Sequence, residues 1–316
     1  MLEPKFYKAH LEKVSRSFAF CIDELETELQ EKVALAYLLF RVLDTVEDSK
    51  WSTEALQKKA FSSFLDLCEN RTEDKNEATN EFIQLFSQAE CKPEEKNLIN
   101  DSLKLFLALK KLSDKDKAPL LLALKTMCSG MQHFTFIKKH QLNNLSELDS
   151  YCYYVAGCIG ELLTAWTSGE SSETRIEESI HFGLFLQKIN ILKDFQDDSQ
   201  AGRNFLWSWQ EVANTLKSHA SAAFRYIQNI PAQRKDYKIF CSWSLFLGLF
   251  SYPTIEKSLL QKKKEKISRL EAWQLLNTVK KNILRENDLN LIFESFLSKL
   301  PVSTYEINTK NLPSIC

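Results

Sequence analysis

The chain has 316 residues, of which 44% are hydrophobic and 26% are charged, a composition typical of globular proteins and unlike that of disordered chains. Only 7 Gly and 7 Pro are present, which disfavours β-sandwiches, barrels and Gly-rich nucleotide-binding folds. Lys and Arg number 41 against 42 Asp and Glu, so a net charge of −1 gives no general attraction to nucleic acid. We therefore expect a mostly helical protein that does not bind nucleic acid.

Targeting and membrane signals are weak. The first residues, Met1 to Lys5, lack the apolar core of a secretory signal, and the eight cysteines form no C-x-x-C pair. The most apolar run, residues 239–252, contains Ser242, Ser244 and Gly248 and falls short of the ~20 residues that span a bilayer. These features predict a cytoplasmic protein with reduced, mostly buried thiols and no transmembrane anchor.

Apolar residues recur at helical spacing along most of the chain, and alternating strand patterns are absent. The spacing predicts helices near residues 30–48, 54–68, 78–90, 94–111, 117–139, 146–168, 174–198, 208–229, 233–260, 270–285 and 287–299. The polar stretches between them are too short for interdomain linkers. We expect one all-α domain over residues 1–300, followed by a polar tail over residues 301–316.

Three carboxylates end the apolar helix predicted near residues 30–48. Asp44, Glu47 and Asp48 have the i, i+3, i+4 spacing that shares one helix face, and Tyr37 and Arg41 precede them on that face. Carboxylates at a helix C-terminus are disfavoured by the helix macrodipole. The cluster is therefore unfavourable unless a cation binds there.

A second cluster with the same spacing follows about 150 residues later. Asp194, Asp197 and Asp198 end another apolar helix, and Asn190 and Gln187 extend a polar stripe before them. Two such stripes facing each other would form a cage for Mg²⁺, which takes oxygen ligands and bridges carboxylates to substrate phosphates. One acidic cluster alone is usually only a solvated helix face, and spacing alone leaves that interpretation open.

Four segments in this order resemble motifs of the squalene and phytoene synthases, which join two prenyl diphosphates head to head. They are Ser15-Arg16-Ser17-Phe18, residues 37–48, residues 151–157 (YCYYVAG) and residues 183–203 with the second acidic cluster. The resemblance implies a single-domain, isoprenoid-synthase-type helical bundle around a central apolar cavity. Thr45 after Asp44, and the GLFLQK run before Asn190, resemble the squalene-forming branch of the family.

The resemblance also implies the chemistry: condensation of two farnesyl diphosphates through presqualene diphosphate, then NADPH-dependent reduction to squalene. Mg²⁺ would be held by Asp44, Glu47, Asp48, Asn190, Asp194, Asp197 and Asp198. The diphosphates would be bound by Ser15, Arg16, Ser17, Arg41, Gln187, Asn190, Lys193 and Arg203. The catalytic set would be Tyr37, Tyr151, Asp44, Asp48, Asp194 and Asp198, and a basic segment with Lys266 and Arg269 would help to bind NADPH.

The chain departs from the family pattern in places. Lys193 stands where the family commonly has Arg, Ala201-Gly202 replaces a Gly-Gly pair, and Leu206-Trp207-Ser208 follows where the family has Trp-Pro. The membrane-spanning tail of eukaryotic members has no counterpart after Pro301, so we expect at most a peripheral membrane contact for product release. The absence of a heptad seam favours a monomer.

Other functions stay open. A non-reducing dehydrosqualene or phytoene synthase would make its product without NADPH. A class I terpene cyclase would use one diphosphate per turnover, and the paired acidic clusters argue against it. A non-enzymatic helical scaffold would tolerate loss of the carboxylates. We interpret His133 and His181 as structural rather than catalytic.

Overall fold

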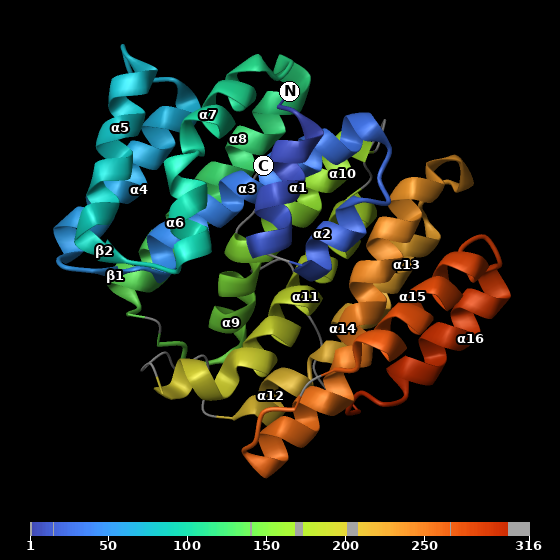
Figure 1. The fold of residues 1–316 in the computed structure, drawn as a ribbon. Coiled ribbons are helices and arrows are strands. Elements are labelled where there is room, and N and C mark those ends of the chain that lie inside the picture. The colour runs from blue at the N-terminus through green and yellow to red at the C-terminus, as the bar shows by residue number, and fades with distance from the viewer. Residues whose placement is uncertain are drawn as a thin grey trace. The chain divides into compact units, whose positions relative to one another are not determined.

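The computed structural model describes residues 2–14, 16–139, 141–167, 173–200, 208–265 and 267–302. The chain divides into two compact units, Met1–Thr135 and Phe136–Cys316. Both are built from helices, which confirms the all-α prediction (Figure 1). The single-domain organisation stays a prediction, and the tail beyond residue 302 lies outside the described residues.

The first unit is arranged around one long apolar helix. Its elements are α1 (Pro4–Val14), α2 (Arg16–Ile22), α3 (Thr27–Asp48), β1 (Lys50–Trp51), α4 (Glu54–Glu69), α5 (Lys75–Leu85), η1 (Phe86–Gln88), β2 (Ala89–Glu90), α6 (Pro93–Asn100), α7 (Ser102–Lys111) and α8 (Asp114–Gln132), followed by the π-helix η2 (His133–Ile137). Helix α3 packs against α1, α4, α6, α7 and α8. It is buried on several sides because apolar side chains surround its axis.

Three details of this unit differ from the sequence-based expectations. Helices α1 and α2 were not predicted, although Tyr7, His10 and Leu11 lie at helical spacing and form the buried face of α1. The helix predicted near 94–111 is two helices that meet at Asp101. The expectation of no strands is wrong at one place, where Lys50 pairs with Glu90 and Trp51 with Ala89 in a ladder too short to show alternation.

The second unit is arranged around α11. Its elements are α9 (Leu145–Cys152), the π-helix η3 (Tyr153–Gly157), α10 (Cys158–Thr167), α11 (Glu173–Gln200), α12 (Trp209–Ala213), α13 (Leu216–Gln228), η4 (Ala232–Arg234), α14 (Lys235–Gln261), α15 (Arg269–Asn282) and α16 (Glu286–Leu297). Helix α11 packs against α9, η3, α10, α12, α13 and α14. Helices α14, α15 and α16 pack side by side, coloured orange to red in Figure 1.

Two glycines let α11 approach the preceding segment closely. A Cβ atom on Gly160 would lie 2.1 Å from the carbonyl oxygen of Ser179, and one on Gly183 would lie 2.3 Å from that of Ala156. Neither distance is compatible with a side chain, so only glycine permits this backbone contact. The pair fixes the segment that contains Tyr151 close to the helix that carries the second acidic cluster.

The apolar run over residues 239–252 lies within the buried part of α14. This agrees with its length, which is too short to span a bilayer. Across the described ranges, no helix combines the length and the apolar character needed to cross a membrane. Six of the seven cysteines that the structure describes are buried.

Candidate active site

The first acidic cluster lies at the C-terminal end of α3, in the first unit. The side chain of Asp44 is 34% exposed and Asp48 is exposed, whereas Glu47 is buried. Residues 44 and 48 lie about 40° apart around a helix, whereas residue 47 lies about 60° to the other side of residue 44. Asp44 and Asp48 therefore share the accessible face, and Glu47 turns toward the protein.

Arg41 lies one turn before Asp44 and is already paired with carboxylates. Its guanidinium forms an ion pair with Glu95 of α6, and Nη1 lies 3.5 Å from Oδ2 of Asp44. Burial raises the pKa of Asp44 to about 7, an effect that Arg41 opposes and that Asp48 and Glu95 reinforce. Without a further cation, the ionised form of Asp44 is disfavoured.

Side chains satisfy the last carbonyl groups of α3. Nε1 of Trp51 donates to the carbonyl oxygen of Val46 at 2.9 Å, and Nε2 of Gln57 donates to those of Val46 and Glu47 at 3.0 and 2.9 Å. A helix leaves its final carbonyls without intrahelical partners, so these donors hold the end that carries the carboxylates. Sequence reasoning missed Gln57 and Glu95, because neither lies near the motif in the chain.

Tyr37 is half-buried on α3, one turn before Arg41. Its ring stacks on Phe18 of α2, with centroids 5.4 Å apart. The structure describes Arg16 and Ser17 only as members of α2, and Ser15 lies outside the described residues. The stack joins the segment that follows Ser15 to the helix of the first acidic cluster.

The second acidic cluster lies near the C-terminal end of α11, in the second unit. Gln187, Asn190, Asp194 and Asp198 follow one another at three- and four-residue spacing, which lines one face. Asn190 is exposed and the side chain of Asp194 is 48% exposed. Lys193 is exposed, with Nζ 3.7 Å from Oδ2 of Asp194. This face is accessible to solvent and offers oxygen atoms.

A lysine from the α14–α15 connection contacts the same cluster. Lys264 forms an ion pair with Asp197. The connection is held to the end of α14 because the Glu265 amide donates to Oγ of Ser258 at 3.0 Å. The same residue joins α14 to α11, since Nε2 of Gln196 donates to the Ser258 carbonyl at 3.2 Å. Sequence reasoning did not single out Lys264.

The other predicted residues of this region are only partly described. Arg203 and Lys266 lie outside the described residues. Arg269 is the exposed first residue of α15. The predicted NADPH segment thus begins two residues after Lys264, which contacts the second acidic cluster.

The segment YCYYVAG forms the end of α9 and the π-helix η3. Tyr151 is buried, and the Tyr153 hydroxyl donates to Oε2 of Glu161 at 2.9 Å. Burial raises the pKa of Glu161. Single-turn π-helices occur often at functional sites, because they reorient side chains within a helix. His181, interpreted from the sequence as structural, is buried and hydrogen-bonded to His219.

The donor chemistry fits the expected metal. Asp44 and Asp48 on α3, and Asn190, Asp194 and Asp198 on α11, offer accessible hard oxygen atoms. Within the described ranges, no three His, Cys, Asp or Glu side chains are gathered around one point. Mg²⁺ usually keeps several waters and takes one or two carboxylates together with substrate phosphates, so it does not require such a cluster.

Comparison with known proteins supports the motifs. The family model for squalene/phytoene synthase matches residues 11–220. The squalene synthase of Homo sapiens is 32% identical over 213 residues, which cover 64% of this chain and 46% of that protein. The squalene synthase of Dictyostelium discoideum is 29% identical over 320 residues, covering 94% of this chain and 71% of that protein.

Solved structures share the fold. A complex of TcSQS with a ligand has a TM-score of 0.72 at 21% identity, covering 92% of this chain and 98% of that one. A dehydrosqualene synthase in complex with a ligand has a TM-score of 0.60 at 18% identity, covering 89% of this chain and 96% of that one. The chain spans about half the length of the human relative. On the match to the family model, which covers most of the chain, this protein belongs to the squalene/phytoene synthase family.

Proposed function

We propose that the protein is a Mg²⁺-dependent prenyltransferase that joins two molecules of farnesyl diphosphate head to head and reduces the product to squalene with NADPH. The observation that carries the proposal is the pair of accessible acidic helix ends, Asp44 with Asp48 and Asp194 with Asp198, inside the segment that matches the family. Presqualene diphosphate as the intermediate, and NADPH as the reductant, are parts of this proposal.

In the first step, the C–O bond to one diphosphate breaks, a C–C bond forms to the second substrate, and a proton is lost as a cyclopropane closes. In the second step, the remaining diphosphate leaves, the skeleton rearranges, and a hydride completes the product. Mg²⁺ would supply charge neutralisation for the departing diphosphates, and NADPH would supply the hydride.

The residues of the chain would bind and orient these groups. The carboxylates of Asp44, Asp48, Asp194 and Asp198 would hold the metal ions, with Glu47 and Asp197 in supporting positions and Asn190 as a neutral ligand. Ser15, Arg16, Ser17, Arg41, Gln187, Lys193 and Arg203 would bind phosphate oxygens. Tyr37 and Tyr151 would orient the diphosphate or move a proton, and Lys266 and Arg269 would bind the NADPH phosphates.

Product analysis tests the proposal. Purified protein is incubated with farnesyl diphosphate and Mg²⁺, with and without NADPH, and the extract is analysed by gas chromatography–mass spectrometry. Squalene formed only with NADPH supports the reducing reaction. Dehydrosqualene under both conditions would instead identify the non-reducing branch and leave Lys266 and Arg269 without this role.

Two carboxylate variants test the site. Asp44→Asn and Asp194→Asn should fold and lose most turnover, because each removes one negative ligand from a metal position. Glu294→Gln, at an exposed position of α16, is the matched control and should keep full activity. Near-normal kcat in either aspartate variant would remove that carboxylate from the site.

We further propose a peripheral membrane contact at the connection between α14 and α15. Leu260, Leu270 and Trp273 are 67%, 64% and 56% exposed there. Residues 256–273 contain six Lys or Arg against three Glu. Exposed apolar side chains among cations are typical of surfaces that bind anionic bilayers. Trp273→Ser should weaken sedimentation with phosphatidylserine-containing vesicles, whereas Leu291→Ser, at a still more exposed site on α16, should not.

The location in the cytoplasm and the monomeric state remain predictions. Size-exclusion chromatography with light scattering tests the second, since a monomer would elute with the chain mass of 36.6 kDa.

A further inference from the structure

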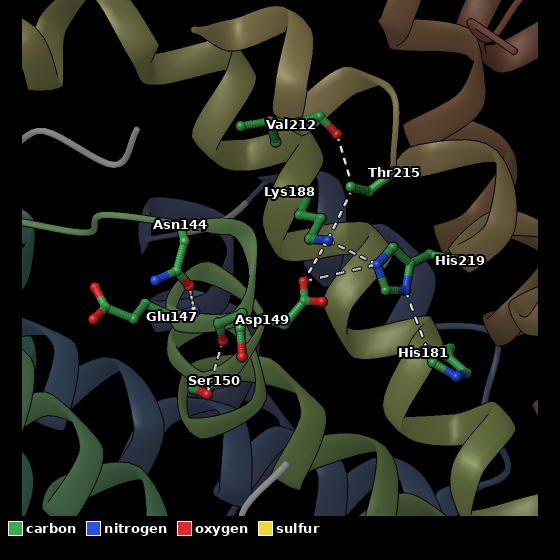
Figure 2. Close-up of polar contacts among 10 residues, drawn as sticks. Asn144, Glu147, Asp149, Ser150, His181, Lys188, Val212, Thr215 and His219 are labelled. Carbon is green, nitrogen blue, oxygen red and sulfur yellow. Dashed lines mark hydrogen bonds and ion pairs between the residues drawn. The ribbon is translucent and has the colours of Figure 1, made fainter. Parts of the chain in front are cut away.

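A lysine is enclosed in the middle of the helix that carries the second acidic cluster. Lys188 on α11 is 0% exposed. Its ammonium lies 2.5 Å from Oδ1 of Asp149, 2.7 Å from Nε2 of His219 and 2.9 Å from Oγ1 of Thr215 (Figure 2). The contact with Asp149 is an ion pair, and those with His219 and Thr215 are hydrogen bonds in which the ammonium donates.

The partners of Lys188 are fixed by contacts of their own. The Thr215 hydroxyl donates to the carbonyl oxygen of Val212 at 2.8 Å, so its oxygen is left to accept from Lys188. Because an ammonium can only donate, Nε2 of His219 accepts, and the neutral ring carries its proton on Nδ1. That atom lies 3.2 Å from Nδ1 of His181 and donates to it. Each polar atom in this chain of contacts therefore has one defined role.

This network joins three parts of the second unit. Lys188 and His181 belong to α11, Asp149 belongs to α9, and Thr215 and His219 lie at the start of α13 (Figure 2). Lys188 is two residues before Asn190, and Asp149 is two residues before Tyr151. The network thus ties the second acidic stripe to the segment that contains Tyr151.

An apolar contact alone would hold α11 less specifically. The buried neighbours of Lys188 on α11 include Leu184, Phe185 and Leu192, whose contacts depend on area and not on direction. One ion pair and two hydrogen bonds from one ammonium, in contrast, are formed together at only one axial position and rotation of the helix. A buried charge left without its partners is strongly unfavourable, so alternative positions of α11 are suppressed.

We propose that Lys188 is a positioning residue that sets the register of α11 against α9 and α13, and thereby the placement of Asn190 and Asp194 relative to Tyr151. This inference rests on the proposed function, because it assigns these residues to the metal and diphosphate site. Lys188 itself touches neither substrate nor metal.

The test measures metal binding separately from turnover. Mn²⁺ replaces Mg²⁺, and its binding in the presence of inorganic diphosphate is followed by electron paramagnetic resonance. Lys188→Met combined with Asp149→Asn removes both charges, so no unpaired buried charge remains, and the new amide can donate to Nε2 of His219. Lys238→Met, which removes another buried lysine from α14, is the matched control.

We expect the double variant to keep its helical circular dichroism and to bind Mn²⁺ about tenfold more weakly, which is about 1.4 kcal/mol. The Mn²⁺ affinity of the control variant, Lys238→Met, should stay within twofold of that of the wild type. Thr215→Val, which removes one acceptor and keeps the side-chain shape, should weaken Mn²⁺ binding about threefold. This second variant decides the question if the double variant does not fold.

The outcomes separate the two proposals. Wild-type Mn²⁺ affinity in the folded double variant, or in Thr215→Val, overturns the positioning role of Lys188. A wild-type protein that binds Mn²⁺ with diphosphate but makes no product from farnesyl diphosphate counts against the proposed function alone.

Discussion

The guanidinium of Arg41 forms an ion pair with Glu95, a residue 54 positions later in the chain, beside the first acidic cluster. One cation is therefore shared between Glu95 and Asp44, whose Oδ2 lies 3.5 Å from the guanidinium. This single positive charge does not compensate the burial of Asp44 and its proximity to Asp48 and Glu95, since the pKa of Asp44 is raised to about 7.

The first prediction concerns Asp44→Asn in the absence of metal. The raised pKa of Asp44 means that its ionisation destabilises the folded state above pH 7, and that this cost disappears as the pH falls from about 7 to 4. Replacing the carboxyl by a neutral amide should increase the free energy of unfolding at pH 8 by about 1 kcal/mol. This value is smaller than the free energy equivalent to the whole pKa shift, because a third of the side chain is exposed to water, which screens the charge.

Urea denaturation in EDTA at pH 8 and pH 4.5 measures this difference. The gain should be present at pH 8 and reduced to about a quarter at pH 4.5. Asp48→Asn, at an exposed position on the same face, should show a smaller gain. An Asp44→Asn variant less stable than the wild type at pH 8 would show that the carboxylate stabilises the metal-free fold.

The sequence predicts the helices well where the apolar periodicity is long, as in α3, α4, α11 and α14. It misses helix boundaries where one or two residues interrupt a continuous apolar pattern. Asp101 ends α6 and begins α7 although the apolar positions continue, and residues 214–215 separate α12 from α13 in the same way. Periodicity reports which face is buried and carries little information on where a backbone hydrogen bond is interrupted.

The site is predictable to the extent that its residues share a helix. Spacing alone predicts that Asp44 and Asp48 share a helix face, as do Asn190 and Asp194, and their role in a metal site stays a prediction. Glu95, Gln57 and Lys264 reach the two clusters from other elements, so no local pattern reveals them. Lys188 lies within the predicted motif, but its role depends on Asp149 and His219, which only the packing of α9 and α13 brings to it.

The second prediction concerns the ion pair of Lys264 and Asp197. In the proposed site Lys264 would compete with a divalent cation for this carboxylate, and the ion pair is weak because solvent screens exposed charges. Lys264→Met should therefore tighten Mn²⁺ binding without diphosphate by about two- to threefold. Lys263→Met, at the exposed neighbouring position, is the control. Weaker Mn²⁺ binding in Lys264→Met would contradict the competition and indicate that the lysine holds the connection in a binding arrangement.

The third prediction concerns the close contact of α10 with α11. Gly160→Ala would place a methyl group against the backbone at Ser179, which cannot move without displacing α11, and we expect a loss of about 3 kcal/mol or more in the free energy of unfolding. Gly248→Ala is the control, because its methyl group would meet the ring of Phe185 at 2.7 Å, and a side chain can move more easily than backbone. In thermal denaturation the melting temperature should fall further for Gly160→Ala than for Gly248→Ala. The reverse order would contradict this account of the contact.

The fourth prediction concerns the acid stability of the second unit. Burial lowers the pKa of His181 to about 4, although Glu177 and Asp149 oppose the shift. The unfolded chain therefore takes up a proton near pH 6.5 that the folded chain does not, so stability is complete above pH 6.5 and is lost as the pH falls toward 4. Between pH 7 and pH 4.5 this group alone should remove about 2 kcal/mol from the free energy of unfolding.

The variant His181→Asn keeps an acceptor for Nδ1 of His219 and cannot be protonated, so its free energy of unfolding should fall less over the same pH range. Urea denaturation at pH 7, 5.5 and 4.5 compares the two proteins, with His133→Asn, at a half-buried position of η2, as the control that should follow the wild type. If the free energy of unfolding falls equally with pH in the wild type and in His181→Asn, the acid sensitivity has another origin. The first alternative is His219, because burial and the charge of Lys188 lower its pKa well below the usual value.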